Sequence, residues 1–195
     1  MKLPSIRTLR KYHRITEVGE IIRRYFALNA FDGVITILGV LVGSYFGNLR
    51  SAASFITLGL ATSFAMGVSG FYGAYMAERA ERRRELAELE ESTLASLKGT
   101  ELSHAAIYAA IAVSLVNGLS PAGAALIAVF PFFFTSIYSV ETAYLASFAV
   151  AFVELFAIGT YLGTVSKERF ILSGIKMVVV GLLCVAIGYL LGAAV

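Results

Sequence analysis

The sequence has few of the residues that form disulfides, clustered metal sites or hydrolytic triads. Cys184 is the single cysteine among 195 residues, which excludes an intrachain disulfide and a Cys-x-x-Cys metal site. Of the two histidines, His13 lies in a basic stretch, and His104 lies at the edge of an apolar run without a Cys or obvious Asp partner. We therefore expect no enzyme activity, no tightly bound cofactor and no nucleic-acid partner.

Charge is also scarce. Only 15% of the residues are charged while 58% are hydrophobic, and the mean hydropathy is +0.78. This composition is far more apolar than that of an ordinary soluble domain and is typical of a multi-pass integral membrane protein. Tryptophan is absent, so tyrosines such as Tyr45, Tyr138, Tyr144 and Tyr161 would have to form the interfacial aromatic belt.

Apolar runs long enough to cross a bilayer occur five times, since a span needs about 20 apolar residues. They cover residues 25–47, 52–77, 102–128, 140–163 and 170–194, and they predict an all-α fold with five transmembrane helices. The third run contains Asn117, Gly118 and Pro121, which predict a kink or break. The expected organisation is a basic amphipathic lead-in (1–24), spans one and two (25–77), a polar helical extension (78–100) and spans three to five (101–195).

Basic residues fall on one side of these spans. Lys and Arg number seven in residues 1–24, five in 78–100 and two in 164–169, whereas Arg50 alone occupies an opposite loop. The positive-inside rule then predicts a cytoplasmic N-terminus and a C-terminus outside the cell or in an organelle lumen. Pro4, Glu17 and Glu20 interrupt the lead-in, so a secretory signal is not expected; its basic residues either meet anionic lipid headgroups or only set the topology.

Three ionisable residues lie deep in the spans: Asp32, Glu154 and Lys176. Such groups are costly in a bilayer and usually face a bundle interior or a water path. Glu154 and Lys176 each lie roughly 16 Å from the turn between spans four and five at 1.5 Å per residue, which predicts a buried ion pair or, alternatively, a proton or ion relay. Asp32 has no basic residue at matching depth, so a permeating cation, water or a symmetry mate is its expected partner.

Two further groups are candidate metal ligands. Met66 lies among small residues in span two, and a thioether beside the Asp32 carboxylate would suit Fe(II) or Mn(II), although plain packing is the other interpretation. In the extension, four carboxylates at i, i+3, i+7 and i+10 form either a cation-binding stripe or a solvated face relieved by arginines. These are Glu78, Glu81, Glu85 and Glu88.

Small residues recur every fourth position in the first two spans, at Gly39, Gly43 and Gly47 and at Gly59, Ser63 and Gly67. Such stripes allow close approach of helices. They predict tight packing of spans one and two, and they are consistent with a dimer axis.

Several stretches together resemble the vacuolar iron transporter family over nearly the whole chain. In span one, residues 30–39 are similar to the family's Asp-Gly stretch that is followed by Thr and Gly; in span two, residues 65–72 are similar to its Ser-Met-(small)2-Gly-Glu-Tyr signature. Gly118 and Pro121 resemble its Gly-x-x-Pro feature. The last span contributes Gly174, Met177, Gly181, Ala186, Tyr189 and Gly192.

The resemblance implies a homodimer in a lipid bilayer that exports Fe2+ or Mn2+ from the cytosol along a path between the first two spans. It gives metal handling to Asp32 and Met66, with Asn29 and Thr36 on the same path, and metal collection to the four-carboxylate stripe. Two departures bear on this. Phe71 replaces the family's Glu before Tyr72, and the extension holds about 24 residues instead of a multi-helix domain.

The alternatives are a non-transporting dimeric membrane scaffold, in which Asp32 is structural, and a diverged member with another cation or substrate. Proton exchange is a further hypothesis, motivated by Glu154 and Asp32. The expected location is the plasma membrane if the chain is prokaryotic and an organelle membrane otherwise.

Overall fold

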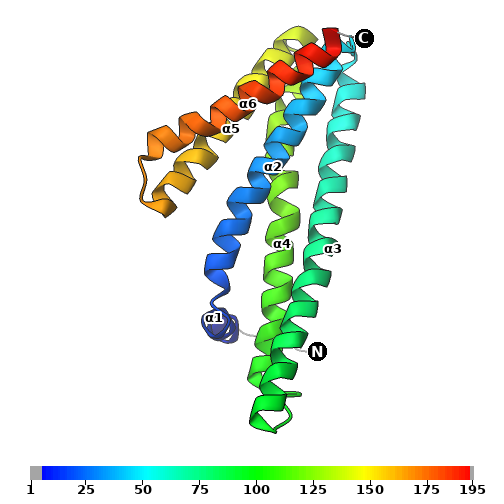
Figure 1. Cartoon of the computed structure of the whole chain (residues 1–195). Helices are drawn as coiled ribbons and strands as arrows, with labels where there is room; N and C mark the ends of the chain where they lie inside the picture. Colours follow the sequence, from blue (N-terminus) through cyan, green and yellow to red (C-terminus); the bar gives the residue numbers. More distant parts are fainter. Residues whose placement is uncertain (1–5, 194–195) are drawn as a thin grey trace. The chain divides into compact units, whose positions relative to one another are not determined.

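The computed structural model describes residues 6–193, and every regular element in that range is helical. The elements are α1 (Ile6–Ile15), α2 (Val18–Phe46), α3 (Ala52–Thr93), α4 (Glu101–Val129), the 3-10 helix η1 (Phe130–Phe134), α5 (Val140–Ser166) and α6 (Phe170–Ala193) (Figure 1). Five helical segments are long and apolar enough to cross a membrane, which confirms the all-α class and the number of spans. Residues 1–5 of the predicted lead-in lie outside the described residues.

Two sequence-based boundaries need correction. The expected break near Pro121 does not occur, because α4 continues through this residue to Val129. The extension after span two is shorter than expected: α3 ends at Thr93, where Leu94 adopts a left-handed conformation with φ 51°. A carboxylate explains the following turn, since Glu90 Oε1 accepts a hydrogen bond from the Leu97 backbone N–H at 2.6 Å.

Contacts divide the chain into two compact units, to which α2, α3 and α4 each contribute residues. The first unit is formed by residues 1–26 and 68–119. Its small apolar core consists of Val18, Ala109 and Val113. Helix α1 joins α4 here through Lys11 Nζ, which donates to Glu101 Oε1 at 2.6 Å, and through the neighbouring rings of Tyr12 and Tyr108.

The second unit, residues 27–67 and 120–195, contains the larger core. At its centre the buried ring of Tyr144 meets Phe55 and Phe132 edge to face, with centroids 5.4 and 4.8 Å away, while Phe55 and Phe132 stack at 3.9 Å. Aromatic pairs in these geometries add to the stabilisation from burial alone. They fix α5 against η1 and the start of α3.

Glycines set the closest helix contacts of the second unit. A Cβ at Gly33 would lie 2.3 Å from the Pro121 carbonyl oxygen, so α2 and α4 meet backbone to backbone there. Gly159 and Gly174 do the same between α5 and α6, which run side by side as a hairpin (Figure 1). Such approaches are typical of helices packed within membranes.

The glycine stripes predicted to join spans one and two do not both serve that purpose. Gly59 packs against Val129 of α4, and Gly39 and Gly43 have open space where a Cβ would be. Spacing within a helix identifies a face that permits close packing, but it does not identify the helix that occupies it. The face of α2 that carries Gly39 and Gly43 is uncovered in the single chain.

Candidate functional site

The candidate site is centred on Asp32, the chain's only aspartate, in the apolar part of α2. Its side chain is exposed, and it forms no ion pair or hydrogen bond with any residue in the range 6–193. The neighbouring Gly33 is buried against Pro121, so the backbone that carries Asp32 is firmly held. A carboxylate is thus presented on the outside of a tightly packed apolar helix.

Two polar residues share the helical face of Asp32. Asn29 precedes it by three residues and Thr36 follows it by four, spacings that place side chains on one stripe of a helix. Both side chains are half-buried, and Asn29 already has an interaction partner. The predicted members of the path on α2 are therefore on one face.

Met66 has a different environment. It is half-buried in α3 and packs against the apolar core of the second unit. The Met66 side chain thus makes packing contacts, as the second interpretation of this residue in the sequence analysis expected. Among residues 6–193 no group of three or more His, Cys, Asp and Glu side chains converges as a metal site. Any metal at Asp32 would need other oxygen or sulfur donors, water or a second copy of the chain.

Three of the four carboxylates of the α3 extension pair with two arginines. Arg82 lies between two of them, with Nε 3.8 Å from Glu78 Oε2 and Nη1 3.0 Å from Glu85 Oε2. Arg84 Nε is 2.9 Å from Glu88 Oε1. Glu81 is exposed and has no ion pair among the residues described. These pairs favour the solvated stripe over a preformed cation-binding face, because a guanidinium already occupies the carboxylate oxygens.

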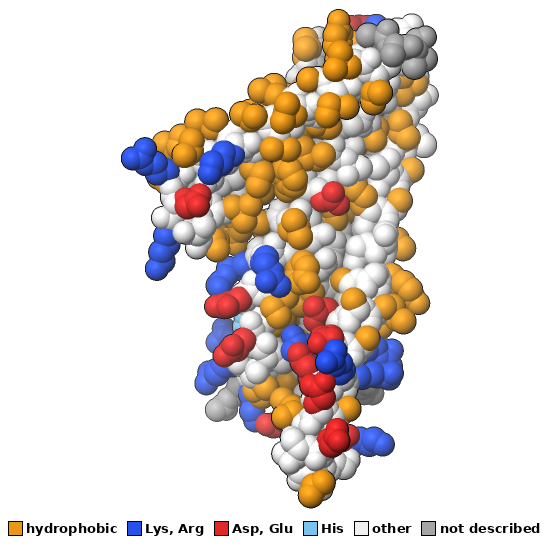
Figure 2. Space-filling view, in the orientation of Figure 1, with side chains coloured by type: hydrophobic (Ala, Val, Ile, Leu, Met, Phe, Trp, Pro, Cys, Tyr) orange, Lys and Arg blue, Asp and Glu red, His pale blue; other side chains and the backbone are white. Residues whose placement is uncertain are grey.

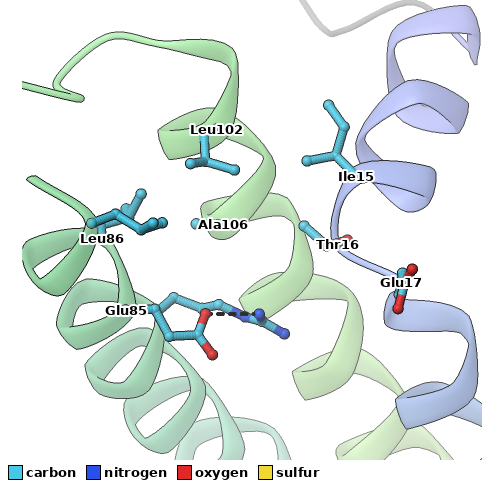
Figure 3. Close-up of a pocket in the computed structure, with 9 residues that line it drawn as sticks. Ile15, Thr16, Glu17, Glu85, Leu86, Leu102 and Ala106 are labelled. Carbon is cyan, nitrogen blue, oxygen red and sulfur yellow. Dashed lines mark hydrogen bonds and ion pairs between the residues drawn. The ribbon is translucent and has the colours of Figure 1, made fainter. Parts of the chain in front are cut away.

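Glu78 stands apart from the other three because it is mostly buried and lines a cavity in the first unit. Only 18% of its side chain is exposed. The cavity, with a volume of about 270 Å³, is bordered by small residues of α3, by Tyr25 of α2, and by Val113 and Asn117 of α4. A second cavity, of about 210 Å³, lies beside the Arg82–Glu85 pair, and Ile15, Thr16 and Glu17 are among the residues that line it (Figure 3).

The predicted ion pair between Glu154 and Lys176 is not formed. Lys176 is 64% exposed at its side chain and lies 3.9 Å from Glu168 Oε2, at the turn between α5 and α6. The reason is geometric. Gly163 faces Phe170 and Gly159 faces Gly174 across the hairpin, so Lys176 lies about three residues, roughly 4.5 Å, nearer the turn than Glu154. Its long side chain extends to the exposed end of the hairpin instead.

Glu154 is left with a buried oxygen that has no partner. Among residues 6–193 three buried side-chain atoms lack a hydrogen bond: Arg82 Nε, Ser147 Oγ and Glu154 Oε2. The last two lie seven residues apart on α5, on one stripe of the helix with the buried Ala151 between them. Unsatisfied polar atoms are expensive inside a membrane protein, so this stripe is a candidate path for water or protons.

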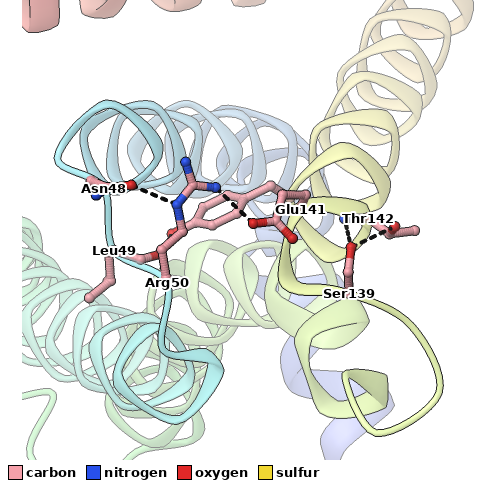
Figure 4. Close-up of polar contacts among 7 residues, drawn as sticks. Asn48, Leu49, Arg50, Ser139, Glu141 and Thr142 are labelled. Carbon is pink, nitrogen blue, oxygen red and sulfur yellow. Dashed lines mark hydrogen bonds and ion pairs between the residues drawn. The ribbon is translucent and has the colours of Figure 1, made fainter.

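A polar network joins the loop that follows α2 to the first turns of α5, and the sequence-based predictions did not include it (Figure 4). Arg50 Nη1 lies 3.0 Å from Glu141 Oε1, and its Nε donates to Asn48 Oδ1 at 2.7 Å. The hydroxyl of the buried Tyr144 donates to the Leu49 carbonyl at 2.9 Å. The sequence does show an isolated basic residue, Arg50, in the loop between α2 and α3, and an acidic residue, Glu141, in the first turn of α5. Nothing in the sequence indicates that the two are in contact.

Comparison with known proteins yields a relative but no activity. Over 172 residues, 87% of each chain, the sequence is 34% identical to the uncharacterized protein MJ0645 of Methanocaldococcus jannaschii. No protein-family model matches the chain.

Proposed function

The chain belongs to the same protein family as the uncharacterized protein MJ0645 of Methanocaldococcus jannaschii, and we propose that it transports a divalent transition-metal cation across a membrane. Because the function of this relative is not known, the proposal rests on the residues of the chain itself. The cation is Fe2+ or Mn2+, it leaves the cytosol, and the path runs between α2 and α3 within a homodimer. The five apolar helices support the membrane location.

The observation that carries the proposal is the unpaired Asp32. A charged side chain in an apolar span is costly, and such residues usually serve a substrate or an ion. Asp32 is exposed, without an ion pair among the described residues, and fixed in place by the backbone contact of Gly33. A permeating cation would supply the missing positive charge, with Asn29 and Thr36 offering oxygen donors on the same face.

The other residues take supporting roles in this proposal. Met66 contributes its thioether when the packing of α3 changes. Glu81 attracts cations before they enter, and Glu78, Glu85 and Glu88 join it when a cation displaces the guanidinium groups of Arg82 and Arg84. Exchange of the metal for protons would use the unpartnered Glu154 carboxylate and Ser147 on α5. Lys176 has no part in that exchange, because it pairs with Glu168.

A second candidate is a non-transporting dimeric scaffold, favoured by one observation. Gly39 and Gly43 present an uncovered surface on α2, where a second copy could pack closely. Asp32 would then be a structural group near a dimer axis. A third candidate is a diverged member of the vacuolar iron transporter family that moves another cation or substrate. It would form the same dimer but would not select Fe2+ or Mn2+.

Flux measurements separate these candidates. The purified full-length chain in proteoliposomes should take up Mn2+ or Fe2+, and Asp32→Asn should reduce the initial rate at least tenfold. Glu91→Gln, which removes an exposed carboxylate outside the proposed path, is the matched control and should retain the rate. No flux from the unmodified protein with either metal would favour the scaffold, and unchanged flux in Asp32→Asn would overturn the role of Asp32.

A further inference from the structure

A third cavity in the first unit has a composition unlike the others. It has a volume of about 240 Å³ and lies between one face of α3 and the first turns of α4. Three arginines of α3, Arg79, Arg82 and Arg83, line one side of it. The hydroxyl-bearing residues Tyr75 and Ser103 also line it, and the wall formed by α4 is otherwise apolar, with Ile107 as its largest side chain.

Two of the three arginines have no ion-pair partner among the described residues. The three occupy positions i, i+3 and i+4, so three like charges share one helical face, which is unfavourable without a counter-charge. Arg82 is paired with Glu78 and Glu85, but Arg79 and Arg83 form no ion pair with any residue of the range 6–193. An anion in the cavity would relieve this repulsion.

Two of the guanidinium groups are already positioned for such an anion. Arg79 Nη1 lies 3.3 Å from the Tyr75 hydroxyl, and its guanidinium stacks over the Tyr75 ring at 5.7 Å. Arg82 is only 16% exposed, and its buried Nε lacks a hydrogen-bond acceptor. Guanidinium groups bind phosphate oxygens through paired, charge-assisted hydrogen bonds, which the unpaired Arg79 and Arg83 could supply.

The apolar wall indicates what is attached to the anion. Ile107 is 56% exposed, and Ile111 and Leu115 continue the same stripe of α4 at intervals of four residues, 41% and 44% exposed. Arg79 lies two residues after the end of the apolar run of α3 at residue 77. The cavity therefore lies at the level where a span leaves the bilayer, with an apolar stripe leading away from it. Basic pockets between helices at the cytoplasmic surface are typical sites for anionic lipid headgroups.

We propose that this cavity binds a phosphate group, and specifically the headgroup phosphate of an anionic phospholipid whose acyl chain lies along the Ile107 stripe of α4. Arg79 and Arg83 bind the phosphate oxygens, the positive charge of Arg82 on the cavity wall adds to the attraction, and the Ser103 hydroxyl is a further donor. None of these residues belongs to the proposed metal path, although Arg82 also pairs with Glu78 and Glu85 of the carboxylate stripe.

Native mass spectrometry of the delipidated full-length chain in detergent tests the proposal. Titration with phosphatidylglycerol should give a saturable one-to-one adduct per chain, whereas phosphatidylcholine should bind at least tenfold more weakly. Arg79→Gln combined with Arg83→Gln should weaken the phosphatidylglycerol adduct about ten- to thirty-fold, the size expected for two arginines at an anionic lipid surface. This pair leaves Arg82 and its carboxylate partners intact.

The matched control combines Arg84→Gln with Lys98→Gln, which removes the same charge from exposed positions outside the cavity and should preserve the adduct. An equal loss in this control would reduce the effect to net charge and overturn the site. Pyrophosphate that competes with the lipid at equal concentration would identify a soluble phosphate ligand and overturn the lipid assignment. If the Gln pair does not fold, Arg79→Lys with Arg83→Lys should retain most of the adduct, and equal binding of the two lipids by the unmodified chain contradicts the proposal.

Discussion

At the scale of single residues, Gly33 and Gly39, which both follow Asp32 on α2, have opposite surroundings. A Cβ at Gly33 would overlap the Pro121 carbonyl oxygen at 2.3 Å, and both atoms belong to backbones that cannot move cheaply. A Cβ at Gly39 would meet nothing within 4 Å. An alanine at position 33 therefore tests the packing of α2 against α4, whereas an alanine at position 39 tests only the helix propensity of α2.

We expect Gly33→Ala to lower the free energy of unfolding by about 1–3 kcal/mol, as overpacking does in a tight core. Gly39→Ala should change it by no more than about 1 kcal/mol, because only helix propensity differs. Unfolding of both variants by sodium dodecyl sulfate in mixed micelles, followed by circular dichroism, measures the difference. Equal stabilities would contradict the backbone contact between α2 and α4.

The unpartnered carboxyl of Glu154 leads to a second prediction. A buried polar atom without a partner costs about 1–3 kcal/mol, so an apolar residue of similar size should relieve that cost. We expect Glu154→Met to raise the free energy of unfolding by about 1–2 kcal/mol in the same assay. A decrease would mean that Glu154 has a stabilising partner. Lys176→Met, which removes an exposed charge that pairs only with Glu168, serves as the control and should change stability little.

At the scale of elements, the loop between α2 and α3 is attached to the start of α5 by bonds of two kinds. The Arg50–Glu141 pair is about half exposed on both sides, and such pairs contribute little to stability. The Tyr144 hydroxyl bonds to the Leu49 carbonyl from a fully buried ring. The neutral hydrogen bond should therefore matter more than the ion pair.

We expect Tyr144→Phe to cost about 1 kcal/mol of unfolding free energy and Glu141→Gln about 0.5 kcal/mol or less. High salt should reduce the effect of Glu141→Gln and leave that of Tyr144→Phe unchanged, because screening weakens exposed pairs. Detergent unfolding at low and high ionic strength gives both numbers. A larger cost for Glu141→Gln would contradict this ranking.

The elements were more predictable than their contacts. The five apolar runs matched the five spans because a bilayer crossing requires a long run that the sequence displays directly. Pro121 was expected to kink or break its helix, and α4 continues through it without a break; neighbouring helices make a proline tolerable within a membrane helix. The relative depth of two residues on neighbouring helices is harder to predict, because it depends on how the helices pack. The contacts of α5 with α6 place Lys176 about three residues nearer the turn than Glu154, and the two do not pair.

At the scale of the whole molecule, an odd number of spans predicts that the two ends of the chain lie on opposite sides of the membrane. The uneven distribution of Lys and Arg predicts that the α3–α4 turn is cytoplasmic and that the loop with Arg50 is not. In a Cys184→Ala background, Ser92→Cys should be protected from a membrane-impermeant maleimide in intact cells, whereas Ser51→Cys should react. The reverse pattern would contradict the orientation and, with it, export from the cytosol.

At this scale the sequence could not predict which donor groups complete a metal site around Asp32. Asp32 was identified correctly as a carboxylate without a basic partner, and the described chain supplies no cluster of acidic, His or Cys ligands around it. The donors that would complete such a site belong to water, to other residue types or to another copy of the chain. A pattern in one chain contains no information on those.

The close approach at Gly70 has an evolutionary consequence. A Cβ there would lie 2.4 Å from the Asn117 carbonyl oxygen and 3.3 Å from the Gly118 Cα, both of which belong to the backbone of α4. In descendants of this sequence, position 70 should therefore remain glycine for as long as α3 and α4 approach each other this closely.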